Sequence, residues 1–220
     1  MHKIVQNLIN IQNLIKSKQS VLENNKAIPQ IIAVSKTFKL NHILPLIEHG
    51  HVDFGENKVQ EAIEKWSEIK SNNNKIKLHL IGKLQTNKVK ISLELFDFIH
   101  SLDNEKLARK ISEEQKKQNL KPKLFIQVNI GNESQKNGIH VKKLGEFYNY
   151  CKELNLIILG IMCIPPIDED PETSFLRMNY LKKKFNFKEQ SMGMSSDYLI
   201  AIKYNATYLR IGSEIFGQRL

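Results

Sequence analysis

The segment Gln30-Ile31-Ile32-Ala33-Val34-Ser35-Lys36 predicts a short buried strand, because a run of mainly β-branched apolar residues ends in two polar ones. Seven later segments share this character, and the stretch between each segment and the next is long enough for one helix. Eight strands that alternate with helices indicate a parallel sheet surrounded by helices. The seven later segments begin at Val52, Lys77, Asp97, Lys123, Leu156, Glu189 and Thr207.

Two α/β architectures contain eight such units: an open doubly wound sheet and a closed (β/α)8 TIM barrel. A dinucleotide-binding open sheet has Gly-x-Gly-x-x-Gly after its first strand, whereas this chain has Ala33-Val34-Ser35-Lys36-Thr37 there. No linker rich in proline, glycine or serine divides the sequence. We therefore predict the barrel, as a single domain over residues 1–220.

The first twenty residues predict an extra N-terminal helix before the first strand. Apolar residues recur there at helical spacing, but asparagines and glutamines interrupt them, so the segment is neither a signal peptide nor a membrane span. Without an export signal we expect a cytoplasmic protein. Its two cysteines, Cys151 and Cys163, lie twelve positions apart without a metal or redox motif, and we predict buried thiols.

The formal net charge of +10 raises the question of nucleic-acid binding. Only four of the 33 basic residues are arginines, and the chain has 21 asparagines, so the charge reflects a general bias towards lysine and asparagine. No basic stripe with interleaved aromatic residues is present, and we expect no nucleic-acid partner. The acidic run 168–172 suits the positive end of a helix better than a metal site. The arginines are Arg109, Arg177, Arg210 and Arg219.

Polar residues at the C-terminal ends of the strands are the candidates for a site, because active sites of this barrel lie there. Ile32, Val34 and Lys36 share one parity, which directs Lys36 into the mouth of the barrel. Burial there would lower the pKa of the amine and make it a nucleophile towards an aldehyde. A lysine that leaves the strand and extends into solvent fits the sequence equally well.

The last two predicted strands end in glycine and serine, over 191–195 and 210–213. Such ends supply N–H and hydroxyl groups that hold phosphate in this fold, although ordinary turns also use these residues. Arg210 has the same inward parity as Tyr208 and Gly212. His79 alternates with apolar residues and is predicted to be a bonded core residue. No metal site, catalytic triad or carboxylate pair stands out, so we assign no catalytic residue.

Taken together, seven motifs resemble those of the pyridoxal phosphate homeostasis proteins, the YggS/PROSC family, which is related to the alanine racemase N-terminal barrel. The motifs occur in order along nearly the whole chain and are specific only as a set. They lie at 32–36, 54–61, 79–88, 127–129, 160–162, 191–195 and 210–217.

The resemblance implies a fold-type III barrel that carries pyridoxal 5′-phosphate (PLP) as a Schiff base on Lys36. A guanidinium cannot accept a proton, so an arginine facing the pyridine nitrogen should leave that nitrogen unprotonated and the ring a poor electron sink. By the same resemblance, the phosphate is held by Ser195, Gly212 and Ser213, the nitrogen faces Arg210, and the ring lies beside Asn57 and Met194.

The family resemblance and the chain length together predict a carrier or buffer in intracellular PLP homeostasis, without strong catalytic activity. Alanine racemase adds a β-rich domain whose tyrosine serves as a second base, and here the chain ends at Leu220. A racemase-like enzyme acting on amino acids is the alternative. The expected partners are PLP and PLP-dependent apo-enzymes, with no membrane, and the protein is expected to be a monomer. Lys83 replaces a residue that is often histidine or proline in the family, so it is either a second aldehyde acceptor or an exposed loop lysine.

Overall fold

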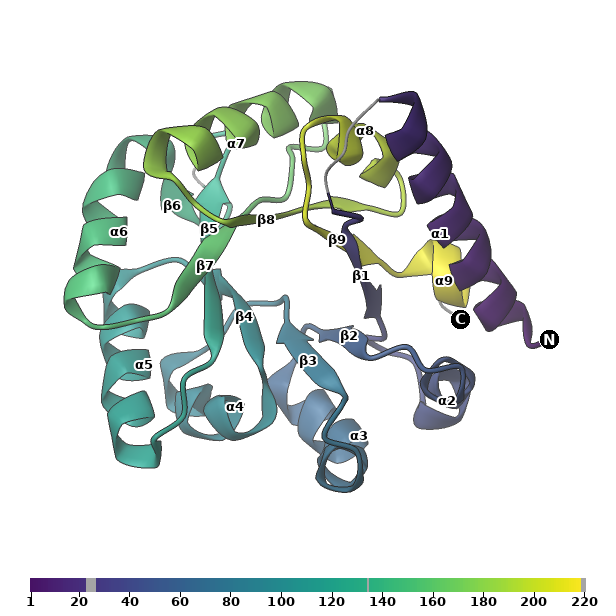
Figure 1. Cartoon of the computed structure of the whole chain (residues 1–220). Helices are drawn as coiled ribbons and strands as arrows, with labels where there is room; N and C mark the ends of the chain where they lie inside the picture. Colours follow the sequence, from purple (N-terminus) through teal and green to yellow (C-terminus); the bar gives the residue numbers. More distant parts are fainter. Residues whose placement is uncertain (23–26, 134, 219–220) are drawn as a thin grey trace.

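The computed structural model describes residues 1–22, 27–133 and 135–218, so Arg219 lies outside the described residues. Within them, eight parallel strands close into a barrel with helices around its outside (Figure 1). The strand order is β4-β3-β2-β1-β9-β8-β7-β5, and β5 pairs with β4 to complete the ring. The predicted (β/α)8 barrel is confirmed. The strands are β1 (Gln30–Val34), β2 (Asp53–Glu56), β3 (Lys77–Leu80), β4 (Phe98–Leu102), β5 (Lys123–Asn129), β7 (Ile158–Met162), β8 (Glu189–Met194) and β9 (Tyr208–Ile211).

Every barrel strand begins within two residues of the segment predicted for it. The short strand β6 (Ile139–His140) was not predicted; it pairs with β5 beyond the ring. Gly138 permits this pairing, because its φ is 121° and a Cβ there would lie 2.6 Å from the Asn129 nitrogen. The connection after β5 thus folds back against the strand end.

Helices follow the strands and cover the barrel. Two of them begin with a side-chain cap: Asn104 accepts from the Leu107 N–H, and Asp170 accepts from the Glu172 N–H. The acidic run 168–172 therefore serves a helix start, and the described residues contain no cluster suited to a metal ion. The helices are α2 (Leu40–Glu48), α3 (Val59–Asn72), α4 (Val89–Leu95), α5 (Glu105–Gln118), α6 (Leu144–Glu153), α7 (Pro171–Phe185), α8 (Tyr198–Lys203) and α9 (Ser213–Phe216).

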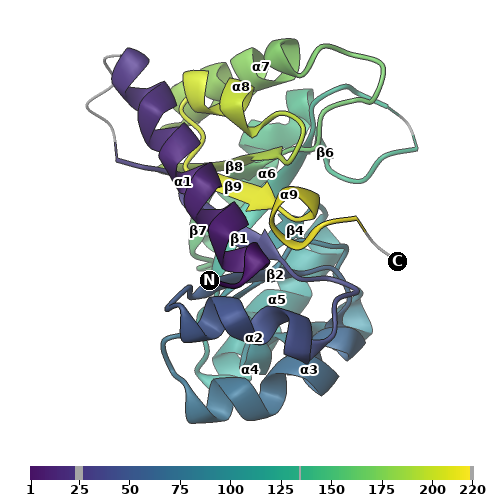
Figure 2. The same cartoon turned by 90° about the vertical axis from the view of Figure 1, so that its right-hand side faces the viewer.

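The extra helix α1 (Lys3–Val21) completes the outer layer of the barrel. It lies beside α8 and α9, which have only six and four residues, and it also contacts α2 (Figure 2). Its apolar face packs there because Leu8, Ile11 and Ile15 are almost completely buried. The amphipathic N-terminal helix predicted from the sequence is thus confirmed, and it covers the region that short C-terminal helices leave uncovered.

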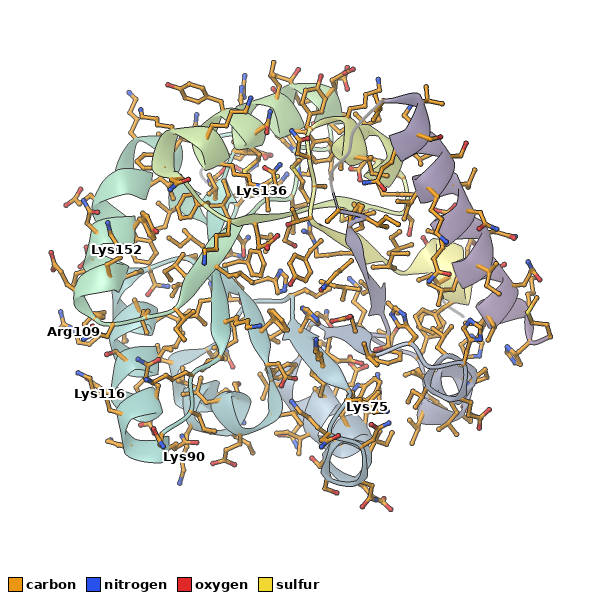
Figure 3. All side chains as sticks on the ribbon, viewed as in Figure 1. Lys75, Lys90, Arg109, Lys116, Lys136 and Lys152 are labelled. Atoms are coloured by element: carbon orange, nitrogen blue, oxygen red, sulfur yellow. The ribbon has the colours of Figure 1, made fainter. Side chains whose placement is uncertain are left out.

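Side chains fill the ring of strands, so the barrel has a packed interior (Figure 3). One apolar core lies between strands and helices, and a separate cluster lies inside the ring. Both cysteines are buried and unpaired, as predicted, and burial raises the pKa of each thiol to about 12. The interior cluster consists of Ile32, Phe98, Phe125, Met162 and Tyr208.

Basic side chains are spread over the outer helices. Lys90, Arg109 and Lys116, for example, lie at the periphery on α4 and α5 (Figure 3). None of the helices described here combines the length and the hydropathy needed to cross a bilayer.

Candidate functional site

A cavity of about 780 Å³ opens at the C-terminal ends of the barrel strands. This volume is typical of small-molecule sites. The structure brings all seven predicted binding residues to its wall, from the ends of β1, β2, β8 and β9. They are Lys36, Asn57, Met194, Ser195, Arg210, Gly212 and Ser213.

Lys36 directly follows β1 and lines the cavity with a half-buried side chain. The preceding residue is held firmly: the Ser35 hydroxyl donates to Glu56 Oε1 at 2.7 Å, and the Ser35 carbonyl accepts from Lys65 Nζ at 2.9 Å. Lys65 and Glu56 form an ion pair at 3.0 Å, with side chains 8% and 0% exposed. Loss of either partner would leave an unpaired charge in the interior, which is costly, so the pair stays formed. Because Ser35 bonds to both partners, the pair holds in place the backbone that leads into Lys36.

The residue after Lys36 is held in a strained conformation. Thr37 has a φ of 70°, which is unusual for a β-branched residue, and its N–H donates to Glu61 Oε1 at 2.6 Å. Burial raises the pKa of Glu61, but hydrogen bonds from Lys65 and Thr37 outweigh it, so the pKa is lowered and the carboxylate stays ionised. The other non-glycine residues with positive φ in the described chain are all asparagines, which tolerate this region. Among the described residues, strain of this kind is thus confined to the segment that carries Lys36.

Backbone N–H groups converge where β9 leads into α9. The N–H groups of Gly212 and Glu214 point to Ser195 Oγ, at 3.3 and 3.4 Å, and Ser213 lies between them on the cavity wall. Gly212 lies beside Val34 of β1, because a Cβ built at Gly212 would be 3.4 Å from the Val34 side chain, an ordinary van der Waals contact. Converging N–H and hydroxyl groups of this kind bind anionic oxygens.

Met194 ends β8, and a carboxylate fixes the turn that follows it. The Met194 N–H donates to Asp197 Oδ1 at 2.5 Å. Burial raises the pKa of Asp197, although the Met194 hydrogen bond and the Arg210 charge oppose this shift. The turn brings Ser195 to the N–H groups of the next strand end.

Arg210 is 4% exposed, and its guanidinium has a fixed orientation. Nη1 donates to Ser191 Oγ and Nη2 donates to the Cys163 carbonyl, both at 2.8 Å. Burial lowers the pKa of Arg210, whereas Cys163 and Asp197 raise it. No carboxylate of the described residues forms an ion pair with it. A planar cation held at two nitrogens can present its remaining surface to a ligand in a defined direction.

Asn57 and Gly82 show how tightly the neighbouring loops approach. A Cβ at Gly82 would lie 2.2 Å from the Asn57 carbonyl oxygen, so only glycine fits there. Asn57 Oδ1 is buried without a hydrogen-bond partner among the described residues. An unpaired buried acceptor on a cavity wall indicates a polar ligand in the cavity.

The ionisable side chains among the described residues of the cavity wall are Lys36, Lys83 and Arg210. All three are cationic types, which favours an anionic ligand. Lys83 is exposed. His79 and Tyr208 do not line the cavity; both are buried in the barrel interior, and His79 is hydrogen-bonded as predicted.

Comparison with known proteins identifies the family. The family model for the N-terminal domain of alanine racemase matches residues 7–219. The pyridoxal phosphate homeostasis protein of Aquifex aeolicus is 37% identical over 86% of this chain and 87% of its own length. That of Vibrio cholerae is 35% identical over 100% of this chain and 98% of its own length. The chain belongs to the pyridoxal phosphate homeostasis protein family.

A solved structure of this family carries a ligand. PipY of Synechococcus elongatus, solved with PLP bound, is 32% identical and superposes with a TM-score of 0.78 over 92% of this chain and 100% of its own. The resemblance stated from the seven motifs is thereby confirmed for both family and fold.

The residues of this homeostasis-family chain fit PLP. The cofactor has an aldehyde, a phosphate and a ring with polar substituents, and the cavity offers an amine, converging N–H groups and an unpaired amide oxygen for these parts. These groups come from Lys36, from Gly212 and Glu214, and from Asn57.

Several supporting groups were not predicted from the sequence, among them Ser191, Glu61 and Lys65. Ser191, which was grouped with the Gly/Ser strand end, is fully buried and bonded to Arg210 instead of lying at loop level. The available signal was its position within the strand, three residues before β8 ends at Met194. Glu61 lies in the motif at 54–61, but its contact with Thr37 was not predicted. Lys65 on α3 had no signal, because nothing in a helical pattern indicates which strand end a helix will support.

Proposed function

We propose that this protein binds PLP covalently through Lys36 and carries or buffers it in intracellular PLP homeostasis. The observation that supports this function is the presence in one cavity of the Lys36 amine, an anion-binding group of N–H donors and the fixed Arg210 guanidinium. Bound PLP supplies an aldehyde carbon, to which the amine nitrogen bonds with loss of water.

The other cavity residues have distinct roles in this proposal. Ser195, Gly212 and Ser213 bind the phosphate through hydroxyl and N–H groups, and Asn57 and Met194 lie beside the ring. Arg210 faces the ring nitrogen. Because it is a permanent donor and cannot accept a proton, it keeps this nitrogen unprotonated.

The same arrangement supports a carrier without strong catalytic activity. An unprotonated ring stabilises carbanions poorly, so proton removal from a bound amino acid is slow. The described cavity wall has no histidine, tyrosine, cysteine or carboxylate that could serve as a second acid or base. In this role we expect a cytoplasmic monomer, with residues 1–220 as one domain, that supplies PLP-dependent apo-enzymes.

Borohydride reduction tests the proposal directly. Protein incubated with PLP, reduced and digested should yield one dominant PLP-modified peptide, and this peptide should contain Lys36. Modification spread over several surface lysines, or found mainly at Lys83, would contradict the assignment.

A racemase-like enzyme is the second candidate, because the matching family model is that of the alanine racemase N-terminal domain. It predicts exchange of the α-hydrogen of added amino acids with deuterated water. Exchange no faster than in a mixture of PLP and buffer would exclude this candidate, and exchange abolished by Lys36→Ala would support it.

A further inference from the structure

Below the cavity, five polar side chains form one continuous hydrogen-bonded chain through the interior of the barrel. Arg210 Nη1 lies 2.8 Å from Ser191 Oγ, and Ser191 Oγ lies 3.0 Å from His100 Nδ1. His100 Nε2 is 3.0 Å from His79 Nδ1, and His79 Nε2 is 3.0 Å from Asp53 Oδ1. These five residues, called the relay below, connect the cavity wall to the start of β2.

Chemistry gives the relay one direction when Asp53 is ionised. Arg210 can only donate, so Ser191 Oγ accepts from it and its own hydrogen is directed to His100 Nδ1. His100 then carries its proton on Nε2 and donates to His79 Nδ1. His79 in turn carries its proton on Nε2 and donates to the Asp53 carboxylate. Every donor and acceptor along the path is satisfied with both imidazoles neutral.

The surroundings keep both imidazoles neutral and fixed. Burial lowers the pKa of His79, although Asp53 opposes this shift. Burial and the Arg210 charge lower the pKa of His100 well below 6.5, and a proton on His79 would lower it further. The His79 ring stacks on Phe98 with centroids 4.2 Å apart, and the His100 ring stacks on Phe125 at 4.3 Å. Neither ring can turn without losing this packing.

We propose that Asp53, His79, His100 and Ser191 are positioning residues that hold the Arg210 guanidinium in place and link it to the Asp53 carboxylate at the far end of the relay. A neutral hydrogen-bonded chain polarised between a cation and an anion strengthens each of its bonds. The charge of Asp197 stabilises the buried Arg210 cation directly, and the relay adds a hydrogen-bonded path from Arg210 to a second carboxylate, that of Asp53. The inference rests on the proposed function only in that PLP is what Arg210 faces.

The first test uses the cofactor-free, wild-type protein. Nitrogen-15 NMR of histidine-labelled protein should show both His79 and His100 protonated on Nε2 alone at neutral pH. A scalar coupling between His100 Nε2 and His79 Nδ1 should be detected across their hydrogen bond. A proton on Nδ1 of either ring, or a charged ring, would overturn the proposal, and this result does not depend on PLP binding.

The second test compares two buried serines. Ser191→Ala removes the acceptor for Arg210, whereas Ser101→Ala removes a buried hydroxyl on β4 that has no hydrogen-bond partner among the described residues. Ser191→Ala should keep PLP on Lys36 but weaken its binding about three- to tenfold, the effect of one lost hydrogen bond, and should shift the near-visible absorbance of bound PLP. Ser101→Ala should change neither.

The outcomes separate the two proposals. Equal affinity and equal spectra for Ser191→Ala and Ser101→Ala would overturn the positioning role, even if both proteins carry PLP on Lys36. Failure of wild-type protein to attach PLP at Lys36 would instead overturn the proposed function, whereas the NMR result would still decide whether the relay exists.

Discussion

The cavity wall and the barrel interior beneath it come from the same strands, but they differ in whether their polar groups have hydrogen-bond partners within the protein. β2 and the residues after it contribute Asp53 to the interior and Asn57 to the wall; the Asp53 carboxylate is bonded to His79, whereas Asn57 Oδ1 is buried and unpaired. Unpaired polar groups are costly unless a ligand completes them. Polar groups of the wall are therefore available to bind a ligand, whereas polar groups of the interior bind one another and keep the site in one conformation.

The largest effect expected at the wall is that of Lys36→Ala. Without the amine, no covalent bond to the aldehyde can form there, so we expect complete loss of the Lys36-type near-visible absorbance and of borohydride-fixed PLP. Mass spectrometry of the intact reduced protein measures this. Lys83→Ala should retain full labelling; loss of labelling in that variant instead would make Lys83 the acceptor.

The largest effect expected on stability comes from the buried support beneath Lys36. Lys65→Met leaves the fully buried Glu56 carboxylate without its cation, which should lower the free energy of unfolding by about 3–5 kcal/mol. Lys203→Met, which breaks an ion pair between the exposed side chains of Lys203 and Glu172, should cost less than about 1 kcal/mol. Urea denaturation measures the free energy of unfolding of both variants. Similar losses of stability in the two would contradict the expected difference between a buried and an exposed ion pair.

The interior should also make stability depend on pH. Burial lowers the folded-state pKa of His51, His79 and His100 from 6.5, so below this pH the unfolded chain binds protons that the folded chain excludes. The free energy of unfolding should therefore fall as the pH drops below 6.5, by up to about 1.4 kcal/mol per pH unit for each such histidine.

Urea denaturation at several pH values tests this dependence. Below pH 6.5, the free energy of unfolding should depend less steeply on pH in His100→Gln, which removes a buried histidine. The dependence should not change in His49→Gln, which removes an exposed histidine. An unchanged pH dependence in His100→Gln would show that His100 can be protonated in the folded protein.

A smaller effect is expected at the phosphate end of the wall. Ser195→Ala removes the hydroxyl to which the Gly212 and Glu214 N–H groups point, and it should weaken PLP binding about tenfold through loss of one charge-assisted hydrogen bond. Ser196→Ala, one residue further along the same wall, should have little effect. Titration with PLP followed by absorbance measures the affinity of both variants. A larger loss of affinity in Ser196→Ala would indicate that the phosphate binds the Ser196 hydroxyl instead.

The sequence by itself determined the barrel and much of its wall. Short β-branched runs separated by helix-length segments identify the strands, and parity along β1 and β9 directs Lys36 and Arg210 inward, because alternate residues of a strand face the same side. Strand ends rich in glycine and serine marked the N–H groups that converge on Ser195. These signals are local, so they can be read without knowing which strands are neighbours.

Only the tertiary structure decided which inward residues meet. His79, His100, Ser191 and Arg210 lie on four strands, and their contacts depend on the stagger between strands, including the register shift between Ser191 and Met194 where β8 pairs with β9. The support of the Lys36 segment by α3 likewise depends on where that helix packs. Stagger and packing arise from the closure of the whole ring, and no local pattern in the sequence records them.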